Sequence, residues 1–388
     1  MNDIDSLADL KIGESSYLFK EINGQPNLWK KTYEVLLSQK KQIVTFLNEI
    51  FKVKNLQIIL TGAGSSAFVG EILQQSFYIK TGIPTRAIPT TDLVTHPKEY
   101  FQKSVPTLLI SFARSGDSPE SIATFKLAER FHKTIYHLII TCNPDGELAK
   151  TAKSAKNALI FLMPDEANDQ ALAMTGSFTS MVLAGLLIAD ISNIEQNEEI
   201  VKAVTEFGKE IIKKYGEELS TLAGRDFKRV VFLGSGPLKG GARESHLKVL
   251  ELTDGQIICQ YDSFLGFRHG PRAVIDESTL LFYLFSCEPY VYKYEVDLVQ
   301  SINSNEHFLF SIGIGQCLSE LPNLTFNLTI DLCCRGTKIP DDYFAICSVI
   351  PAQILGAYKS LALGLAPDSP SKNGGISRIV QGVTIYPY

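Results

Sequence analysis

The first half of the chain alternates short apolar runs with longer segments in which apolar residues recur at helical spacing. Such runs are typical of strands buried on both faces of a sheet, and the longer segments are typical of the helices that cover it. This alternation predicts a parallel sheet with helices on both faces. The strand-like runs are Gln57–Leu60, Ile88–Thr90, Thr107–Phe112, His137–Thr141 and Ala158–Leu162.

Helical patterns surround these runs. The residues 1–28 show no regular spacing, and we expect them to be irregular. The predicted helices are Leu28–Phe51, Ala67–Lys80, a segment that opens at Ser118, the apolar Gln170–Ile191 and the amphipathic Glu198–Leu222.

The pattern then restarts, with strand-like runs at Arg229–Leu233, Leu280–Ser286 and Phe308–Ile312 and helical segments at Gly241–Leu252, Pro289–Asn303 and Ile346–Leu363. Both halves share the order strand, turn, helix, which predicts two doubly wound α/β sheets of flavodoxin type. We expect an N-terminal helical segment over residues 1–50, a first domain over 51–200 and a second domain with the C-terminal tail over 201–388.

Two turns rich in glycine and hydroxyl groups follow strand-like runs of the first half. They are TGAGSS at residues 61–66 and the segment Arg114–Ser118. Pro119 suits a first helical position and Ser118 suits the N-cap, so backbone N–H groups, a helix dipole and hydroxyls gather there. Because ligands of such sheets bind at the carboxyl ends of strands, we predict a phosphate site. An ordinary serine-capped turn is the alternative.

Neither turn carries a nucleotide-binding fingerprint. Gly62 and Gly64 lack the third glycine of GxGxxG, and the GxxxxGK[ST] loop is absent. A small phosphorylated ligand held by hydroxyl groups is the better interpretation.

Composition narrows the class of protein. The hydrophobic share of 45% and the charged share of 20% are those of a globular protein. A net charge of -5 gives no reason to expect nucleic acid or an anionic membrane as a partner.

The seven cysteines and six histidines show no metal-ligand spacing, and reduced thiols fit a cytoplasmic location. We interpret Cys333 and Cys334 as buried strand residues. The N-terminus is too polar for a signal peptide, and the apolar window Ser180–Ile191 is too short to span a bilayer.

The two turns resemble those of the SIS (sugar isomerase) domain family, and tandem SIS domains would account for nearly the whole chain. In that family the turns hold the phosphate of a phosphosugar. The resemblance therefore implies that this chain binds a phosphorylated hexose or hexosamine through Ser65, Ser66, Arg114, Ser115 and Ser118.

The resemblance has two departures. Ala113 stands where many family members have a further serine. The second half has Ser286-Cys287-Glu288-Pro289-Tyr290 at the equivalent strand end, without the family's turn. We therefore expect one phosphate site per chain, in the first half.

Residues 246–272, HLKVLELTDGQIICQYDSFLGFRHGPR, are similar to the isomerase domain of glucosamine-6-phosphate synthase. Lys248 and Glu251 match its Lys-x-x-Glu helix pair, and His269 begins its His-Gly-Pro loop. The resemblance implies that Glu251 moves a proton between C2 and C1 of the opened sugar and that His269 assists ring opening. Lys248 would hold the carboxylate or polarise a sugar hydroxyl. From the residues alone, a surface ion pair and a loop-packing histidine are the alternatives.

The tail Ala366–Tyr388 and the segment Ala171–Met181 resemble one tandem-SIS group, described as galactosamine-6-phosphate deaminase or tagatose-6-phosphate ketose/aldose isomerase. The implied reaction converts D-galactosamine 6-phosphate and water to D-tagatose 6-phosphate and ammonia. It needs no metal, nucleotide or flavin cofactor. The synthase's imine-forming tail lysine aligns with Gln381, so that role is not transferred; Lys372 is near in sequence but unaligned.

Other functions stay open at this point. One is ketose/aldose isomerisation without loss of nitrogen, and another is a phosphosugar-sensing regulator built from SIS domains. The sequence does not choose between galacto and gluco substrates, nor does it exclude N-acetylated ones. The resemblance also implies a homodimer or higher homo-oligomer, in which His269 acts either in its own chain or across a subunit interface.

Overall fold

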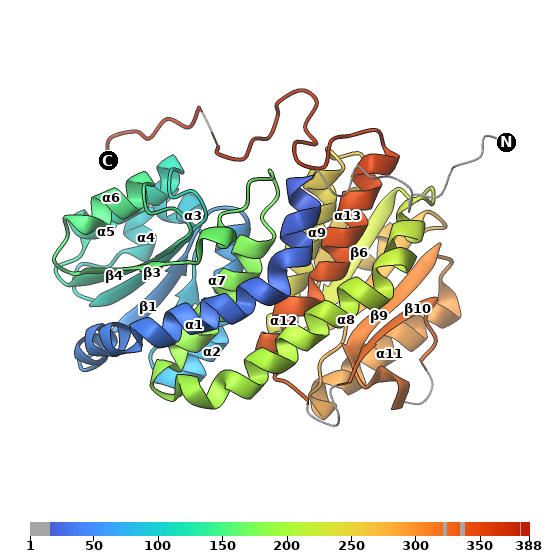
Figure 1. The fold of residues 1–388 in the computed structure, drawn as a ribbon, viewed down its shortest axis with the longest axis horizontal. Coiled ribbons are helices and arrows are strands. Elements are labelled where there is room, and N and C mark those ends of the chain that lie inside the picture. The colour runs from blue at the N-terminus through green and yellow to red at the C-terminus, as the bar shows by residue number, and fades with distance from the viewer. Residues whose placement is uncertain (1–15, 321–323, 334–337, 381) are drawn as a thin grey trace. The chain divides into compact units, whose positions relative to one another are not determined.

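The computed structural model describes residues 16–320, 324–333, 338–380 and 382–388 (Figure 1). The chain forms two compact units that do not follow its linear order. The first-sheet unit comprises Asn27–Asp169, Gly176–Val201 and the tail Ser377–Tyr388. The second-sheet unit comprises the residues up to Pro26, Gln170–Thr175 and Lys202–Ile376. The family-domain boundaries given above stay a prediction.

The first sheet has five parallel strands in the order β2-β1-β3-β4-β5. This is the doubly wound order of flavodoxin-like folds. In this order, the direction in which successive strands are added to the sheet reverses between the first and third strands. The strands are β1 (Gln57–Thr61), β2 (Thr85–Ala87), β3 (Thr107–Ala113), β4 (Ile135–Thr141) and β5 (Ala158–Leu162).

Helices cover both faces of the first sheet, because neighbouring residues on each strand point to opposite sides. Ile59 and Leu109 pack with Leu93 of α3 (Thr90–Thr95) and Ala128 of α5 (Pro119–Phe131). On the other face, Gly70 of α2 lies against Leu60. The helices of this unit are part of α1 (Tyr17–Phe51), α2 (Ser65–Thr81), α3 (Thr90–Thr95), α4 (Pro97–Tyr100), α5 (Pro119–Phe131), α6 (Glu147–Lys153) and α7 (Gly176–Ala189).

The second sheet repeats the topology of the first. Its order, read from its other edge, is β7-β6-β8-β9-β10, and all pairs are parallel. The strands are β6 (Arg229–Gly234), β7 (Ile258–Asp262), β8 (Thr279–Leu284), β9 (Phe310–Gln316) and β10 (Leu328–Leu332). The helices are α9 (Pro237–Leu252), α10 (Phe264–Phe267), α11 (Pro289–Asn305), α12 (Asp341–Ser348), α13 (Ile350–Ala362) and part of α8 (Glu198–Ala223). The prediction of two doubly wound parallel sheets is confirmed.

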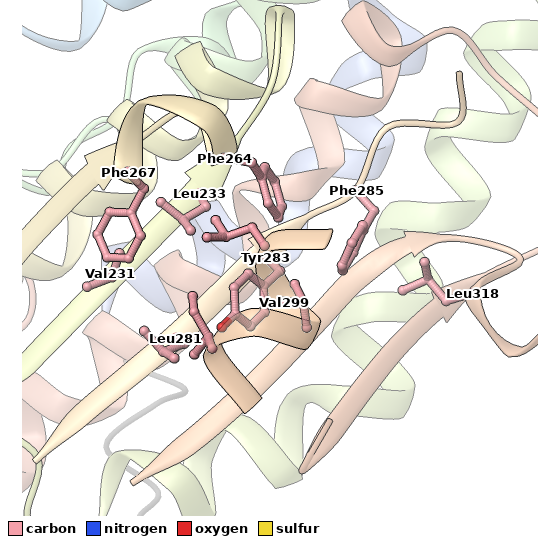
Figure 2. Close-up of a cluster of buried hydrophobic side chains, with 11 residues drawn as sticks. Val231, Leu233, Phe264, Phe267, Leu281, Tyr283, Phe285, Val299 and Leu318 are labelled. Carbon is pink, nitrogen blue, oxygen red and sulfur yellow. The ribbon is translucent and has the colours of Figure 1, made fainter. Parts of the chain in front are cut away.

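One face of the second sheet carries an aromatic-rich core (Figure 2). Leu281 and Tyr283 of β8 pack with Phe264 and Phe267 of α10 and with Val299 of α11, and all of them are buried. This packing holds α10 in place, and the predicted His-Gly-Pro loop follows α10 directly.

The duplication extends to single residues in the first βα turn of each sheet. Gly64 and Gly236 occupy equivalent positions before α2 and α9, with φ of 57° and 54°. Two positions earlier, a Cβ on Gly62 would lie 2.5 Å from the carbonyl carbon of Ser66, and a Cβ on Gly234 would lie 2.3 Å from the carbonyl oxygen of Leu238. Glycine is required at these places because the turn folds back onto its own strand end.

The N-terminal prediction was wrong in part. Helix α1 begins at Tyr17, whereas residues 17–27 were expected to be irregular. The Asp368 carboxylate accepts hydrogen bonds from the backbone N–H groups of Tyr17 and Leu18, at 3.0 and 2.8 Å, and so caps the helix from a distant part of the chain. Leu18 and Ile22 are then buried. No pattern of neighbouring residues predicts such a cap.

Several predicted boundaries also need correction. Ile88–Thr90 is not a strand, because β2 ends at Ala87 and Ile88 is instead a buried residue of the loop that follows. Helix α7 begins at Gly176 rather than at Gln170, since the Asp169 carboxylate accepts the N–H groups of Gly176 and Ser177.

The predicted helix Ile346–Leu363 is two helices that break at Val349, because Pro351 cannot donate the hydrogen bond that a continuous helix needs. The run at 308–312 is β9 at Phe310–Gln316. The edge strand β7 was not predicted, and β10 ends at Leu332, one residue before the strand that was expected at Cys333. Cys333 follows β10 and is exposed, so the prediction of a buried strand residue was wrong for it. Cys334 lies outside the described residues.

By length and composition, one helical stretch of the described chain, Asp341–Ala362, could cross a membrane. A second would count if Gly176–Ala189 and Ile191–Ala223 were taken together as one bent span. Because 89% of the window in the first stretch is buried inside the protein, this is weak evidence: core helices of globular proteins pass the same test.

Candidate functional site

The two predicted phosphate turns follow neighbouring strands at the switch point of the first sheet. Strands β1 and β3 pair in parallel, with Thr61 opposite Ser111, so their carboxyl ends meet at one edge. Residues 62–64 lead from β1 into α2, and Arg114–Ser118 lead from β3 into α5. Doubly wound sheets bind ligands at this point, between the two strands from which the chain winds in opposite directions.

The first turn places its serines in the opening turn of α2. Ser65 and Ser66 are the first two helical residues, and both are buried. Gly64 precedes them as the N-cap and supplies no side-chain cap. The positive end of a helix dipole therefore lies at this turn, which favours an anion.

The second turn is held in shape by the loop that follows β4. The Asn143 side chain donates a 2.8 Å hydrogen bond to the Ser115 carbonyl oxygen, and the Glu147 N–H donates to the Asp117 carboxylate at 3.0 Å. Gly146 packs so closely that a Cβ there would lie 2.4 Å from the Ser115 oxygen. Gly116 has φ of 71°, which suits glycine. These contacts fix the shape of the turn.

The hydroxyl groups of this turn differ in their bonding. Ser115 is buried, and its Oγ accepts the Asp117 N–H at 3.2 Å. Ser118 is the N-cap residue of α5, as predicted, but its side chain makes no capping bond. Both hydroxyls therefore retain a proton to donate to an anion.

Arg114 connects the second turn to the C-terminal tail. Its side chain is buried, and Nη2 donates a 2.6 Å hydrogen bond to the Arg378 carbonyl oxygen. The Arg378 guanidinium in turn donates to the Asp169 carbonyl and to Asn168 Oδ1, each at 2.8 Å. The sequence analysis did not select Arg378. The available signal was its charge, since it is the single charged residue in the segment 373–388.

The second group of candidates lies on α9 in the second-sheet unit. Lys248 Nζ makes an ion pair and hydrogen bond with Glu251 Oε1, one turn away. It also lies 3.1 Å from Glu244 Oε1, one turn in the other direction. Glu244 was not predicted, although its i, i+4 spacing from Lys248 could have suggested it.

The three side chains differ in how far they are exposed to solvent. Glu244 and Lys248 side chains are 0% and 1% exposed, whereas the Glu251 side chain is 16% exposed. Burial alone would lower the pKa of Lys248, but the two carboxylates outweigh it and raise that pKa above its ordinary value. Lys248 is therefore a fixed cation, and Glu251 is the more exposed of its two carboxylate partners.

His269 lies on an exposed turn directly after α10. Its backbone N–H donates to the Gly266 carbonyl at 3.0 Å. Within the described residues, its imidazole makes no hydrogen bond or ion pair to the α9 side chains. The structure thus brings Lys248 and Glu251 together but does not join His269 to them. The serine turns belong to the other unit.

The turn of the second sheet that corresponds to Arg114–Ser118 has its backbone donors occupied by carboxylates. The Ser286 N–H donates to Glu295 Oε2, and the Cys287 N–H donates to Asp341 Oδ1, both at 2.9 Å. Ser286 Oγ also bonds Asp341. These backbone N–H groups therefore already have internal acceptors, which agrees with the expectation that the second half lacks a phosphate site.

The remaining candidates are a metal site and the tail residues Lys372 and Gln381. The described residues contain no group of three or more His, Cys, Asp or Glu side chains placed to hold a metal ion. Gln381 lies outside the described residues. Lys372 is exposed, and its backbone N–H donates to the Asp254 carboxylate at 3.4 Å.

The chain is similar to known proteins over most of its length. The family model of the SIS domain matches residues 49–189. The chain is 38% identical over 374 residues to the D-galactosamine-6-phosphate deaminase AgaS of Shewanella sp., covering 95% of this chain and 91% of that protein. This chain belongs to the SIS domain family.

Two other SIS relatives extend the comparison. The crystal structure of tagatose-6-phosphate ketose/aldose isomerase from Escherichia coli has a TM-score of 0.87 and 36% identity, and the match covers 97% of each chain. A glutamine–fructose-6-phosphate aminotransferase of Pyrococcus horikoshii is 23% identical over 374 residues, which is 93% of this chain and 57% of that protein. The predicted relation to the synthase's isomerase domain is confirmed.

Proposed function

We propose that this SIS protein is an amino-sugar-phosphate deaminase that converts D-galactosamine 6-phosphate and water to D-tagatose 6-phosphate and ammonia. The observation that carries the proposal is the 38% identity to a D-galactosamine-6-phosphate deaminase over 95% of the chain. The buried ion pair of α9 supplies a carboxylate suited to that reaction.

The proposed chemistry is a proton transfer followed by hydrolysis. The Glu251 carboxylate removes the proton from C2 of the opened amino sugar while O1 gains a proton, which gives a cis-enolamine. It then returns the proton to C1 as the nitrogen loses one. C1 becomes a primary alcohol and C2 an imine. Water then adds to the imine, and ammonia leaves from the carbinolamine, so that C2 becomes the ketone.

The neighbouring side chains have distinct roles in this proposal. Lys248 holds the Glu251 carboxylate in position through their ion pair. Glu244 balances the charge of Lys248 from the buried side. His269 assists ring opening, since an imidazole can give or accept a proton near neutral pH.

The phosphate of the substrate binds at the first sheet. Ser66, Ser115 and Ser118 donate hydroxyl hydrogen bonds, Ser65 lies beside them in the first turn of α2, and Arg114 contributes positive charge. The support for this assignment is that both turns end at the switch point of the sheet, where two helix N-termini meet.

A second candidate function is ketose/aldose isomerisation without loss of nitrogen. It is favoured by the 36% identity to the crystal structure of tagatose-6-phosphate ketose/aldose isomerase from Escherichia coli. The same proton transfer serves both reactions, and only the departure of ammonia separates them.

The enzyme acts in the cytoplasm as a homodimer or higher homo-oligomer, without nucleic acid or membrane partners and without a cofactor. His269 then serves either its own chain or a neighbouring subunit.

The test is ammonia release from galactosamine 6-phosphate, with glucosamine 6-phosphate in parallel and ketose 6-phosphate assayed in both. Ammonia together with tagatose 6-phosphate is the expected result. Interconversion of aldose and ketose phosphates without ammonia would replace the deaminase with the isomerase. Binding without turnover would favour a phosphosugar-sensing regulator.

A further inference from the structure

Two cysteines meet where neighbouring strands of the second sheet end. Strands β9 and β10 pair in parallel, and the last register pair is Gln316 opposite Leu332. Cys317 and Cys333 are the next residue on each strand, and the Cys317 N–H donates to the Leu332 carbonyl at 3.3 Å. The two Sγ atoms lie 2.7 Å apart. Since a disulfide bond is about 2.05 Å long, the sulfur atoms need to approach by only about 0.7 Å to bond.

The backbone on the Cys317 side is held against β10. Asp331 accepts hydrogen bonds from the Leu318 N–H at 2.7 Å and from the Ser319 N–H at 2.9 Å. Cys317 itself has φ of 57°, a left-handed conformation that is uncommon outside glycine, so the strand ends abruptly at this residue. The approach of the thiols is therefore fixed by strand register and by Asp331, and it does not depend on side-chain rotamers alone.

The two thiols differ in access. Cys333 is exposed, whereas Cys317 is 6% exposed. Burial raises the pKa of Cys142, Cys259 and Cys347 far above the ordinary value, so these thiols are poor nucleophiles. Burial and then the Asp341 carboxylate raise the pKa of Cys287 to about 12. Among the described cysteines Cys333 is the exposed one, so an oxidant in solution meets it first.

We propose that Cys317 and Cys333 are a dithiol modification site. Low-molecular-weight disulfides such as oxidised glutathione oxidise the pair, and a reversible disulfide forms between Cys317 and Cys333. The Cys333 thiolate attacks one sulfur of the oxidant and releases one thiol, which leaves a mixed disulfide on Cys333. The Cys317 thiolate then attacks Cys333 Sγ and releases the second thiol. Two protein thiols are oxidised and one small disulfide is reduced to two thiols. This site is independent of the proposed deaminase reaction.

The experiment incubates the full-length protein with oxidised glutathione, counts thiols after denaturation and maps cross-links by mass spectrometry of unreduced peptides. The thiol count should fall from seven to five. The cross-linked peptide should join Cys317 to Cys333, and dithiothreitol should reverse both changes. A count that stays at seven, or a cross-link to any other cysteine, would overturn the proposal.

Three variants test the order of the steps. Cys317→Ser should stop at a glutathione adduct on Cys333, because the resolving thiol is absent. Cys333→Ser should give neither adduct nor cross-link at this site, because the remaining thiol is buried. The matched control Cys334→Ser should form the cross-link as the native chain does. Loss of the cross-link in Cys334→Ser, or its persistence in Cys333→Ser, would exclude the assigned pair.

Discussion

Arg114 Nη2 donates a 2.6 Å hydrogen bond to the carbonyl oxygen of Arg378, so the candidate phosphate turn and the C-terminal tail share a contact within the first-sheet unit. The Arg378 side chain fixes that carbonyl through the Asn168 and Asp169 oxygens. The tail is thereby part of the environment of the turn, and Arg378 is a positioning residue for Arg114.

Arg378→Ala should raise KM for the phosphosugar about tenfold and change kcat less than twofold, because Arg114 loses a fixed acceptor while the α9 pair is untouched. Steady-state kinetics test this, together with proteolysis of the tail, which should become faster. The control is Arg130→Ala, which removes an exposed hydrogen bond to Tyr388 farther along the same tail. An equal effect of both variants would mean that the tail as a whole matters rather than Arg378.

Glu251→Gln should lower kcat by a factor of about 10² to 10⁴ and leave the Kd for the phosphosugar within a few-fold, since the amide keeps the shape of the side chain but cannot take the C2 proton. Single-turnover kinetics and calorimetric binding separate the two effects. The matched control is Glu206→Gln, in an exposed i, i+3 pair with Lys209. Substantial turnover by Glu251→Gln would refute the assignment of the proton carrier.

Ser115→Ala should weaken phosphosugar binding by a factor of about 10 to 100, the usual effect of losing one hydrogen bond to a charged group. Its Oγ also accepts the Asp117 N–H, so the turn loses an internal bond as well. Binding of the phosphorylated sugar and of its unphosphorylated counterpart should be compared. Ser154→Ala, an exposed helix-end serine of the same unit, is the control. An unchanged affinity in Ser115→Ala would count against the phosphate turn.

The raised pKa of Glu295 predicts that the stability of the protein depends on pH. Burial, with the Asp341 charge as a smaller cause, raises the pKa of Glu295 from 4.5 to about 7 against the opposing hydrogen bonds of Ser286 and Ser235. The native state therefore keeps a proton that the unfolded chain loses above pH 4.5. The contribution of this group to the free energy of unfolding should fall by about 3 kcal/mol as pH rises from 4.5 to 7.

Glu295→Gln removes that titration, because its amide is neutral at every pH. Denaturant unfolding of both proteins at pH 5 and pH 8 tests it. The stability of the variant relative to the native chain should increase between the two values. A difference that is constant with pH would show that Glu295 has the same pKa in the folded and unfolded states.

The local pattern of the sequence was sufficient for the duplicated parallel architecture. The middle of such runs, as in Leu108–Ile110 and Val230–Leu233, is buried on both faces and continuously apolar, which is a signal carried by a few adjacent residues. The turn glycines and the spacing of Lys248 and Glu251 are likewise local, since one helical turn brings the latter pair together without help from the rest of the fold.

The tertiary structure decided what depends on residues far apart in the chain. Asp368 begins α1 at Tyr17, and Arg378 joins the tail to Arg114, across more than 250 residues in each case. The pairing of β9 with β10 brings Cys317 to Cys333, and burial distinguishes Glu251 from Glu244. Caps, strand register and burial arise only when distant segments pack, so no window of neighbouring residues contains them.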